Sequence, residues 1–384
     1  MKILVDLTAA YDHLTGIERF AINITKALVE QHAEHDYVLF FKNEVHPAFS
    51  AIARANAVEC AVLSGTNKLI FNQWTLPHAL RRTTADVFFF PAFCTPWLFR
   101  APGIVNTIHD LSDFECHEGK PWPKALYSRL GIKHAKRCSA RIVTVSSFSK
   151  ERIVALLGIP EEKVSVVYNG VSDGFRDEPT RDTDVRSKYG ISADYLLAVG
   201  TVEPRKNLRL LIEAYHAMCP SIGIDLAICG RMGWNQRESL GGEGSWEGVH
   251  VTGFVVDGDL PSLYRHARAF VFPSKYEGFG IPPVEALASG CPVICSDAAS
   301  LPEIMGDAAI YFKSGSVESL KDAIGAVLNM DDDVRDDLRR RGVVQASKYR
   351  WETEAEKLHD VLMCSNATGK GMKGSSPKRA CDSR

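Results

Sequence analysis

The sequence predicts an α/β protein with two doubly wound, Rossmann-like parallel sheets that face each other across a central cleft. Short apolar runs of strand length alternate with amphipathic helical patterns almost throughout the 384 residues. Alternation of this kind is typical of parallel sheets covered by helices. It is interrupted once, near the middle of a chain that is long for one domain and comfortable for two. We therefore expect ligands to bind between two domains of similar size.

Six apolar runs in the first half of the chain have the length of buried strands: KILVDL, YVLFFK, DVFFFP, GIVNTIHD, RIVTVS and VSVVYNG. Helical patterns lie between them. The clearest is an apolar stripe that repeats at i, i+3, i+4, i+7 and i+11 over Ile17, Phe20, Ala21, Ile24 and Leu28. These elements predict a first domain over residues 1–175.

The same rhythm restarts in the second half with YLLAVG, DLAICG, GVHVTGFV, AFVFPS, PVICSD and AAIYF. Residues 172–190, between the halves, carry charge without apolar periodicity and form the best linker candidate. We expect a second domain over residues 176–350 and a helix over 351–364 that returns to the first domain. The remaining segment, 365–384, is rich in Gly, Ser and Lys and predicts a disordered tail.

Composition and charge favour an ordinary soluble globular protein. Hydrophobic residues make up 45%, and 45 Lys and Arg against 47 Asp and Glu leave a net charge of -2, so nothing global favours nucleic acid as a partner. The N-terminal apolar run is too short for a signal peptide, and no stretch reaches the ~20 apolar residues of a membrane span. We expect a cytoplasmic protein. The ten cysteines include no Cys-x-x-Cys pair, which favours buried thiols over disulfides or zinc ligands.

Residues 275–297, KYEGFGIPPVEALASGCPVICSD, place two carboxylates on either side of a rigid turn. Pro282 and Pro283 suit the first turn of a helix, so Glu277 lies in the loop before a short helix and Glu285 lies inside it. Loops that follow parallel strands collect ligands, because helix N-termini point their N–H groups there. On residue types alone, the two acids suit a glycosidase pair, a metal site or two solvated groups.

Two other loops suit a phosphate-bearing ligand. Arg205 and Lys206 follow the strand YLLAVG, and Asn207 is a candidate N-cap of the next helix. A charge-assisted hydrogen bond contributes ~1.5–3 kcal/mol where water is excluded, although a solvated pair on a surface turn fits equally well. Gly16 opens the first long helix, where backbone N–H groups favour an anion, or it is a plain turn residue. Its loop lacks G-x-G-x-x-G, and the chain has no G-x-x-x-x-G-K-[ST], which argues against a P-loop enzyme.

Two features of the first half have open interpretations. His109, at the end of the strand GIVNTIHD, can face the cleft and bind a sugar hydroxyl, or it can be a structural histidine bonded to a backbone carbonyl. Residues 119–142, GKPWPKALYSRLGIKHAKRCSARI, predict a basic helix that either touches an anionic membrane or presents a solvated face. Its cations are Lys120, Lys124, Arg129, Lys133, Lys136, Arg137 and Arg141.

Several stretches resemble the retaining glycosyltransferases of family four, the glycosyl transferases group one type, which have the GT-B fold. They are VGTVEPRKN, the HD after a strand of the first half, and GFVVDGDLPSLYRHARAFVFPSKYEGFGIPPVEALASGCPVICSDAASLPEIMGDAAIYF. The resemblance is most specific between Tyr195 and Phe312 and continues over residues 1–360. It implies an enzyme similar to the bacterial polysaccharide mannosyltransferases.

The resemblance also implies roles for individual residues. In the Glu-x7-Glu motif of the family, Glu277 is expected to bind hydroxyls of the donor sugar and Glu285 the ribose of the nucleotide. Arg205 and Lys206 match the basic residues that bind the pyrophosphate, and His109 matches a histidine beside the reaction centre. The other donor-binding positions are Gly16, which closes over the phosphates, the backbone of Phe279, Gly280 and Ile281 at the sugar and diphosphate, and Gly230, Arg231, Phe254 and Val255 around the base.

One departure from the family pattern concerns the leaving group. Thr201 stands where many members carry Arg or Ser, so Arg205 is expected to take over part of the charge stabilisation. The implied reaction needs fixed cations and N–H dipoles, and no metal or other cofactor is expected. The acidic run at Asp331–Asp333 belongs to a polar loop or a helix start and does not predict a metal site.

The resemblance implies transfer of a hexose from a nucleotide diphosphate sugar, with mannose as the preferred sugar and GDP-mannose as the preferred donor. The acceptor would be a hydroxyl of a lipid-linked oligosaccharide in O-antigen, capsule or exopolysaccharide assembly, at the cytoplasmic face of an anionic inner membrane. Other readings stay open: a glucosyl- or rhamnosyltransferase using a UDP- or dTDP-sugar, an epimerase or phosphorylase of the same architecture, or a non-catalytic protein that binds sugar nucleotides.

Overall fold

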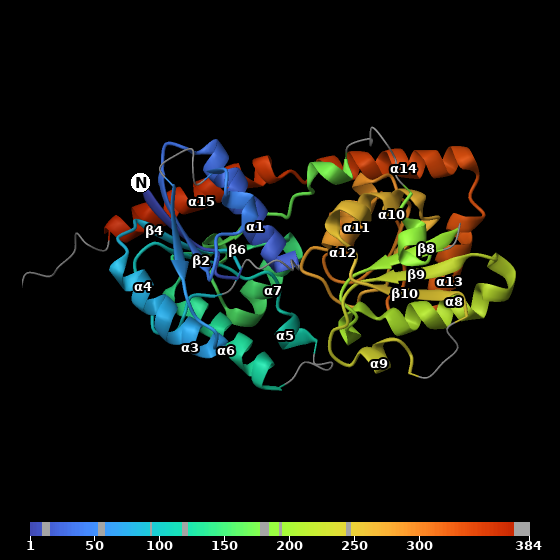
Figure 1. The fold of residues 1–384 in the computed structure, drawn as a ribbon, viewed down its shortest axis with the longest axis horizontal. Helices are drawn as coiled ribbons and strands as arrows, with labels where there is room; N and C mark the ends of the chain where they lie inside the picture. Colours follow the sequence, from blue (N-terminus) through green and yellow to red (C-terminus); the bar gives the residue numbers. More distant parts are fainter. Residues whose placement is uncertain are drawn as a thin grey trace, which may run out of the picture.

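The computed structural model describes residues 1–9, 16–52, 58–92, 94–116, 122–176, 184–191, 194–242 and 247–371, without the side chains of 219–222 and 367–371. They form two parallel sheets with helices on both faces, in an N-terminal and a C-terminal domain that lie side by side (Figure 1). The predicted fold class is confirmed.

The N-terminal sheet has seven strands in the order β3-β2-β1-β4-β5-β6-β7. They are β1 (Lys2–Asp6), β2 (Asp36–Lys42), β3 (Val58–Leu63), β4 (Val87–Phe90), β5 (Ile104–Thr107), β6 (Arg141–Thr144) and β7 (Val164–Val166). The central strand β1 pairs in parallel with β2 and β4, with Ile3 opposite Tyr37 and Val87. Sequence analysis missed β3. As an edge strand it is only half-buried, so its sequence lacks the continuous apolar run of the others.

Helices cover the N-terminal sheet on two faces. Ile3 and Val5 pack under α1 (Gly16–Gln31) and α15 (Trp351–Gly371), while Leu4 points to the opposite face and packs with α4 (Leu76–Arg82). Side chains alternate across a strand, so one apolar run serves both layers. The other helices of this domain are η1 (Pro47–Phe49), α3 (Lys68–Ile70), η2 (Phe71–Thr75), α5 (Ser112–Glu115), α6 (Trp122–Cys138), α7 (Ser147–Leu157), η3 (Glu161–Lys163) and η4 (Asp173–Phe175).

The C-terminal sheet has six strands in the order β10-β9-β8-β11-β12-β13, and all six were predicted. They are β8 (Tyr195–Val199), β9 (Asp225–Cys229), β10 (Val249–Gly253), β11 (Ala269–Phe272), β12 (Val293–Ser296) and β13 (Ala309–Phe312). On one face lie α8 (Leu208–Ile222) and α13 (Val317–Leu328). On the other lie α10 (Leu260–His266), α11 (Ile281–Ala288), α12 (Leu301–Met305) and α14 (Asp332–Ser347). The short helices η5 (Arg186–Tyr189), η6 (Pro204–Lys206), α9 (Gln236–Ser239) and η7 (Asp257–Asp259) complete the domain.

One predicted helix cap is wrong. Asn207 does precede α8, but its backbone is left-handed with φ 54° and its side chain makes no capping hydrogen bond. The tight turn of η6 brings the chain into α8 through this conformation, which Asn tolerates better than most residues. The residue type therefore predicted the position correctly and its role incorrectly.

Two chain segments cross between the domains side by side. The first follows β7 and the second joins α14 to α15 (Figure 1). The Val171 N–H donates to the Tyr349 carbonyl at 3.0 Å, and the Arg176 guanidinium donates to the same carbonyl at 2.7 Å. After this crossing, α15 packs against α1 and β1 of the N-terminal domain. It continues to Gly371, so residues 365–371 are helical where a tail was expected, and residues 372–384 lie outside the described residues.

Among the described residues, no helix combines the length and the apolar character that a membrane crossing requires. Cys229 and Cys295 are buried in their strands as predicted. Burial raises the pKa of both thiols, which fits the expected role as small apolar core residues.

Candidate functional site

A cavity of about 1020 Å³ lies between the two domains. Its lining includes the loops that follow β1, β4 and β5, with residues of α3, η2 and α6, on one side and the loops that follow β8, β9, β10 and β11 on the other. The carboxyl ends of parallel strands meet at one edge of each sheet, so the two domains present their loops to a shared space. Every predicted site residue lines it: Gly16, His109, Arg205, Lys206, Gly230, Arg231, Phe254, Val255, Glu277, Phe279, Gly280, Ile281 and Glu285.

A buried carboxylate stands at the centre of the C-terminal side. Glu277 Oε1 accepts from the Lys206 ammonium at 2.7 Å and from the Ser274 hydroxyl at 2.5 Å, while Oε2 lies 2.9 Å from the Arg205 guanidinium. Burial raises the pKa of Glu277, but Arg205 and Lys206 outweigh burial and lower the pKa to about 2. Glu277 is therefore an anion near neutral pH.

A second carboxylate, which sequence analysis missed, also holds Arg205. The Arg205 guanidinium donates to Glu203 Oε1 at 2.8 Å and 3.1 Å and to the Tyr276 carbonyl at 2.7 Å. Burial lowers the pKa of Arg205, and Glu277 and Glu203 reverse that effect and raise it. The sequence signal that could have identified Glu203 is the position of an acid two residues before Arg205 in the same loop. A bound phosphate would therefore meet cations that already have carboxylate partners.

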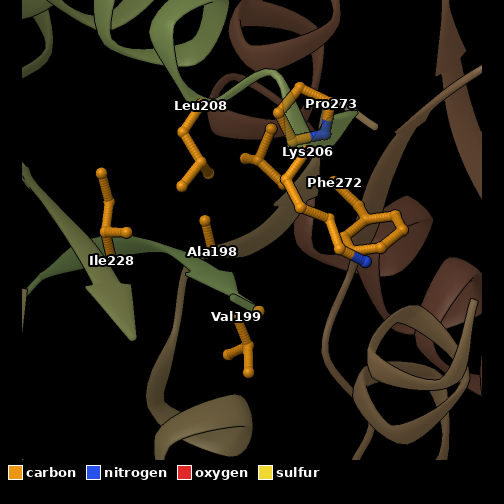
Figure 2. A pocket seen from close by; sticks show the side chains of 9 residues that line it. Ala198, Val199, Lys206, Leu208, Ile228, Phe272 and Pro273 are labelled. Carbon is orange, nitrogen blue, oxygen red and sulfur yellow. The ribbon is translucent and has the colours of Figure 1, made fainter. Parts of the chain in front are cut away.

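Lys206 is held by apolar surroundings as well as by Glu277. Figure 2 shows its chain beside a small pocket of about 10 Å³, with the amine end next to the ring of Phe272. The ammonium lies 4.8 Å from the centre of that ring, at a distance typical of a cation–π contact. Burial lowers the pKa of Lys206, and Glu277 opposes this effect. The ammonium is thus fixed at the end of β8.

His109 reaches the cavity from the N-terminal side. Its Nε2 lies 2.8 Å from the Pro91 carbonyl oxygen, so Nε2 carries a proton and Nδ1 is left as an acceptor. Burial lowers the pKa of His109, which favours this neutral form. The ring also meets Phe20 edge-on, with 5.1 Å between the ring centres. His109 therefore makes the structural hydrogen bond that the sequence allowed and lines the cavity as well.

Glu285 is the second acid of the motif, and its main partner comes from the other domain. Its Oε1 accepts from Arg19 Nη1 at 2.9 Å, and its Oε2 accepts from the Tyr264 hydroxyl at 3.3 Å. Arg19 Nη2 also donates to Asp257 at 2.5 Å. Burial raises the pKa of Glu285, and Arg19 opposes this effect. Sequence analysis missed Arg19, whose signal is a cation one turn after Gly16 in α1.

The loop before α11 touches the N-terminal domain through a glycine. A Cβ atom on Gly278 would lie 2.6 Å from the His109 carbonyl oxygen, a distance that real side chains do not adopt. Gly280 then turns the chain with φ +95°, and α11 begins at Ile281 with prolines in its first turn, as predicted. Glu303 adds a contact across the cleft, since its carboxylate accepts the Ser147 N–H at 2.8 Å at the start of α7.

The residues predicted to surround a base lie on the loops after β9 and β10. The Arg231 guanidinium sits 4.7 Å from the centre of the Phe254 ring. The next residue, Val255, is buried, whereas the Phe254 side chain is exposed. Gly230 approaches the β8 loop so closely that a Cβ atom would lie 1.9 Å from the Gly200 carbonyl oxygen. The floor of this part of the cavity is therefore backbone, and a flat aromatic ring stands at its side.

The basic helix α6 has an apolar face. Trp122, Leu126 and Leu130 are exposed at a spacing of four residues, which places them on one side of the helix. The Gln73 side chain donates to the Tyr127 hydroxyl at 2.9 Å and joins η2 to α6. Three more exposed apolar residues lie on α3 and η2. We call these six residues the apolar surface: Leu69, Ile70, Trp74, Trp122, Leu126 and Leu130.

The predicted cations of this segment divide into two groups. Three of them donate to backbone carbonyls and help to hold the fold, namely Arg129, Lys136 and Arg141. Three others are exposed on the described part of α6, namely Lys124, Lys133 and Arg137, and they lie on the same helix as half of the apolar surface. Lys120 lies outside the described residues. Some cations of this segment thus stabilise the fold, and others are exposed on a helix that also exposes apolar side chains.

One group of side chains away from the cavity offers atoms that could bind a metal ion: His32, Glu34 and His359, whose ligand atoms lie within 4.8 Å of one another. The His32 and His359 rings, however, stack in parallel with 3.7 Å between their centres. The lone pairs of imidazole lie in the ring plane, so two stacked rings cannot direct them at one ion. The cluster joins the turn after α1 to α15 by ring stacking.

Comparisons with known proteins agree with this architecture. Residues 14–175 match the family described as Glycosyltransferase Family 4, and residues 183–344 match Glycosyl transferases group 1. O-antigen chain mannosyltransferase B of Escherichia coli is 32% identical over 371 residues, which cover 92% of this chain and 97% of the relative. O-antigen chain mannosyltransferase RfbU of Salmonella typhimurium is 30% identical over 229 residues, which cover 59% of this chain and 61% of the relative.

Solved structures match over nearly the whole chain. Anabaena Alr3699/HepE, solved in complex with UDP and glucose, superposes with a TM-score of 0.71 at 19% identity and covers 94% of this chain and 99% of its own. WaaG, a glycosyltransferase involved in lipopolysaccharide biosynthesis, superposes with a TM-score of 0.72 at 16% identity and the same coverage. At these identities the likeness supports the fold.

Proposed function

The chain belongs to the family 4 glycosyltransferases, and from that premise we propose that it transfers mannose from GDP-mannose to a lipid-linked oligosaccharide during assembly of a surface polysaccharide. The names of the relatives from Escherichia coli and Salmonella support mannose as the sugar and O-antigen as the product class. The observation that carries the proposal is the meeting of Arg205, Lys206 and Glu277 at one point of the interdomain cavity.

A nucleotide diphosphate sugar suits this point of the cavity. Arg205 and Lys206 lie in the loop at the carboxyl end of β8. Phe279, Gly280 and Ile281 line the same cavity at the N-terminal end of α11, where backbone N–H groups are not used within the helix. Fixed cations and helix N-termini together favour a diphosphate. The complex of HepE with UDP-glucose supports a nucleotide sugar as the class of donor. The aromatic ring of Phe254 and the backbone at Gly230 would take the base.

The reaction starts with the bond between C1 of the sugar and the diphosphate oxygen. This bond breaks with its electron pair on the oxygen, and Arg205, Lys206 and the α11 N–H groups stabilise the charge that develops. The acceptor hydroxyl oxygen bonds to C1 on the face that the diphosphate leaves, and its proton passes to the departing phosphate oxygen. The configuration at C1 is then retained. The leaving-group charge is met by side chains and dipoles, so we include no divalent metal in this step.

Glu277 suits the role of a hydroxyl ligand better than that of a nucleophile. A carboxylate has about four acceptor sites, and Lys206, Arg205 and Ser274 already occupy three of those of Glu277. As far as the described residues show, about one site remains for a sugar hydroxyl, and the bonds that the cations make fix its direction. A carboxylate held by two cations also has little negative charge to offer an electrophilic carbon.

The acceptor would approach along the apolar surface. Lys68, Leu69, Trp97 and Tyr127 line the cavity, so the apolar surface of α3, η2 and α6 reaches its edge. Exposed apolar side chains on the same side of α6 as Lys133 and Arg137 are typical of a protein face that lies on an anionic membrane, whereas Lys124 lies on the other side of the helix and lines the cavity. A lipid-linked acceptor at the cytoplasmic face of the inner membrane would satisfy both features.

The proposal is tested by assaying the purified protein with GDP-mannose, UDP-glucose and dTDP-rhamnose on membranes that carry lipid-linked oligosaccharides. We expect transfer from GDP-mannose, an α-linked product by NMR, and unchanged rates with a metal chelator. Transfer from another donor would contradict the choice of sugar, and a β-linked product would contradict retention. Loss of activity with chelator that Mg²⁺ restores would contradict the metal-free mechanism.

A further inference from the structure

The ion pair between Arg19 and Glu285 joins the two domains inside the cavity. Arg19 comes from α1 and Glu285 from α11, 266 residues apart in the chain, and their side chains are 18% and 5% exposed. The guanidinium is a fork, with Nη1 on Glu285 and Nη2 on Asp257 of η7. Three elements from two domains thus fix the position of one buried carboxylate.

The partners of Glu285 leave room for a ligand with two hydroxyl groups. Among the described residues, Oε1 accepts from one partner, Arg19, and Oε2 accepts from one partner, Tyr264. Each carboxylate oxygen offers about two acceptor sites, so about one remains on each oxygen. Two free sites on one carboxylate match the two neighbouring hydroxyls of a ribose ring.

We propose that Arg19 is a positioning residue for the nucleotide, which orients Glu285 and keeps it ionised for the ribose hydroxyls. This inference rests on the proposed function, because it takes Glu285 as the ribose ligand of a nucleotide donor. In this role Arg19 acts on the ribose through the carboxylate that it holds. The N-terminal domain would then contribute to nucleotide affinity through a residue that sequence analysis did not place in the site.

The charges around Glu285 explain why Arg19 is needed. Among the described residues, the charged and titratable groups that face it are Arg19 from α1, Asp257 from η7 and Tyr264 from α10. Burial and Asp257 raise the pKa of Glu285, and Arg19 is the group that opposes them with a positive charge. Without Arg19, the pKa of Glu285 would rise further, so the carboxylate would more readily bind a proton on an oxygen that the ribose hydroxyls need.

The experiment measures binding of GDP and 2′-deoxy-GDP by calorimetry between pH 6 and 8. The proteins are the wild type, Arg19→Gln, Arg19→Lys and Glu285→Gln, with Arg209→Gln as a matched control on the exposed Arg209–Glu213 pair of α8. We expect Arg19→Gln to weaken GDP binding by about tenfold or more and to lose most of the preference for GDP over 2′-deoxy-GDP. Relative to wild type, its binding should fall further as the pH falls, and Arg19→Lys should remove that extra pH dependence.

Two results would overturn the inference. One is Arg19→Gln with the wild-type preference for GDP over 2′-deoxy-GDP at every pH. The other is tighter GDP binding in Arg19→Gln, which would mean that Arg19 competes with the ribose for Glu285. If either result appears while the wild type binds GDP, the proposed function stands and this inference falls. A wild type that binds no nucleoside diphosphate would overturn both.

Discussion

Lys206 and Glu277 form a buried ion pair with 2.7 Å between Nζ and Oε1, and their side chains are 13% and 9% exposed. One residue comes from the loop after β8 and the other from the loop before α11. Removing one partner of a buried pair leaves an uncompensated charge and typically costs about 3–5 kcal/mol. The two loops therefore depend on each other, and a substitution in one changes the electrostatics of both.

Glu277→Gln tests the centre of the site. Gln has nearly the same shape but neither the charge that holds Arg205 and Lys206 nor a carboxylate for a sugar hydroxyl, so we expect kcat to fall by about 100-fold or more. Steady-state kinetics with GDP-mannose measures the change. Glu213→Gln, an exposed acid on α8, serves as the control and should keep wild-type kinetics. Near-normal turnover of Glu277→Gln would refute its assigned role.

Lys206→Gln tests the predicted contact with the diphosphate. Loss of one charge-assisted hydrogen bond should weaken GDP binding by a factor of about 10 to 150. Guanosine, which lacks the diphosphate, should bind the variant and the wild type with the same affinity. An equal loss for GDP and guanosine would instead indicate a distorted loop, and no loss for GDP would remove Lys206 from the phosphate site.

The pH dependence of stability should report the Glu277 ion pairs. Arg205 and Lys206 lower the pKa of this carboxyl from 4.5 to about 2, so its contribution to stability is present above pH 4.5 and is lost as the pH falls toward 2. We expect the unfolding free energy of the wild type to exceed that of Glu277→Gln at pH 7, and the gap to narrow between pH 4.5 and 2. Urea titrations over this range measure it. A gap that stays constant with pH would show that the pKa of Glu277 is the same in the folded and the unfolded protein, and that Arg205 and Lys206 do not lower it.

The apolar surface should bind vesicles that contain anionic lipid. Trp74→Ser combined with Trp122→Ser should lower cosedimentation with such vesicles, because each exposed ring loses contact with the lipid interface. Neutralising Lys133 and Arg137, the exposed cations on the same side of α6 as Trp122, should weaken binding to anionic vesicles by about 1 kcal/mol per charge. Val343→Ser with Val344→Ser, on exposed positions of α14, is the control. Equal wild-type binding with and without anionic lipid would exclude an anionic membrane as the partner of this surface.

The strands could be predicted because most of them are covered by helices on both faces, and such strands are continuous apolar runs. The exception, β3, lies at the sheet edge and mixes polar with apolar residues. Residues of the glutamate motif and the loop after β8 could be placed together for a related reason, since parallel strands deliver their following loops to one edge. Local pattern and topology were sufficient for this part of the site.

The partners of those residues could not be predicted. Arg19 meets Glu285 only because the two domains stand at one particular distance, and no pattern in α1 or α11 encodes that distance. Glu203 is close to Arg205 in the chain, but an acid beside an arginine in a loop is as common on surfaces as in sites. Asn207 had the right residue type for a cap, and its backbone adopted a left-handed conformation instead.

The hydrogen bond between Val171 and Tyr349 has a consequence for how the enzyme opens. It ties both interdomain crossings together, so among the described residues the covalent connection between the domains is concentrated at one narrow joint. We expect the halves to swing about a single axis through that joint. Such a rotation would separate Arg19 from Glu285 and Gly278 from His109 in the same motion. Donor binding and nucleotide release would then depend on one domain movement.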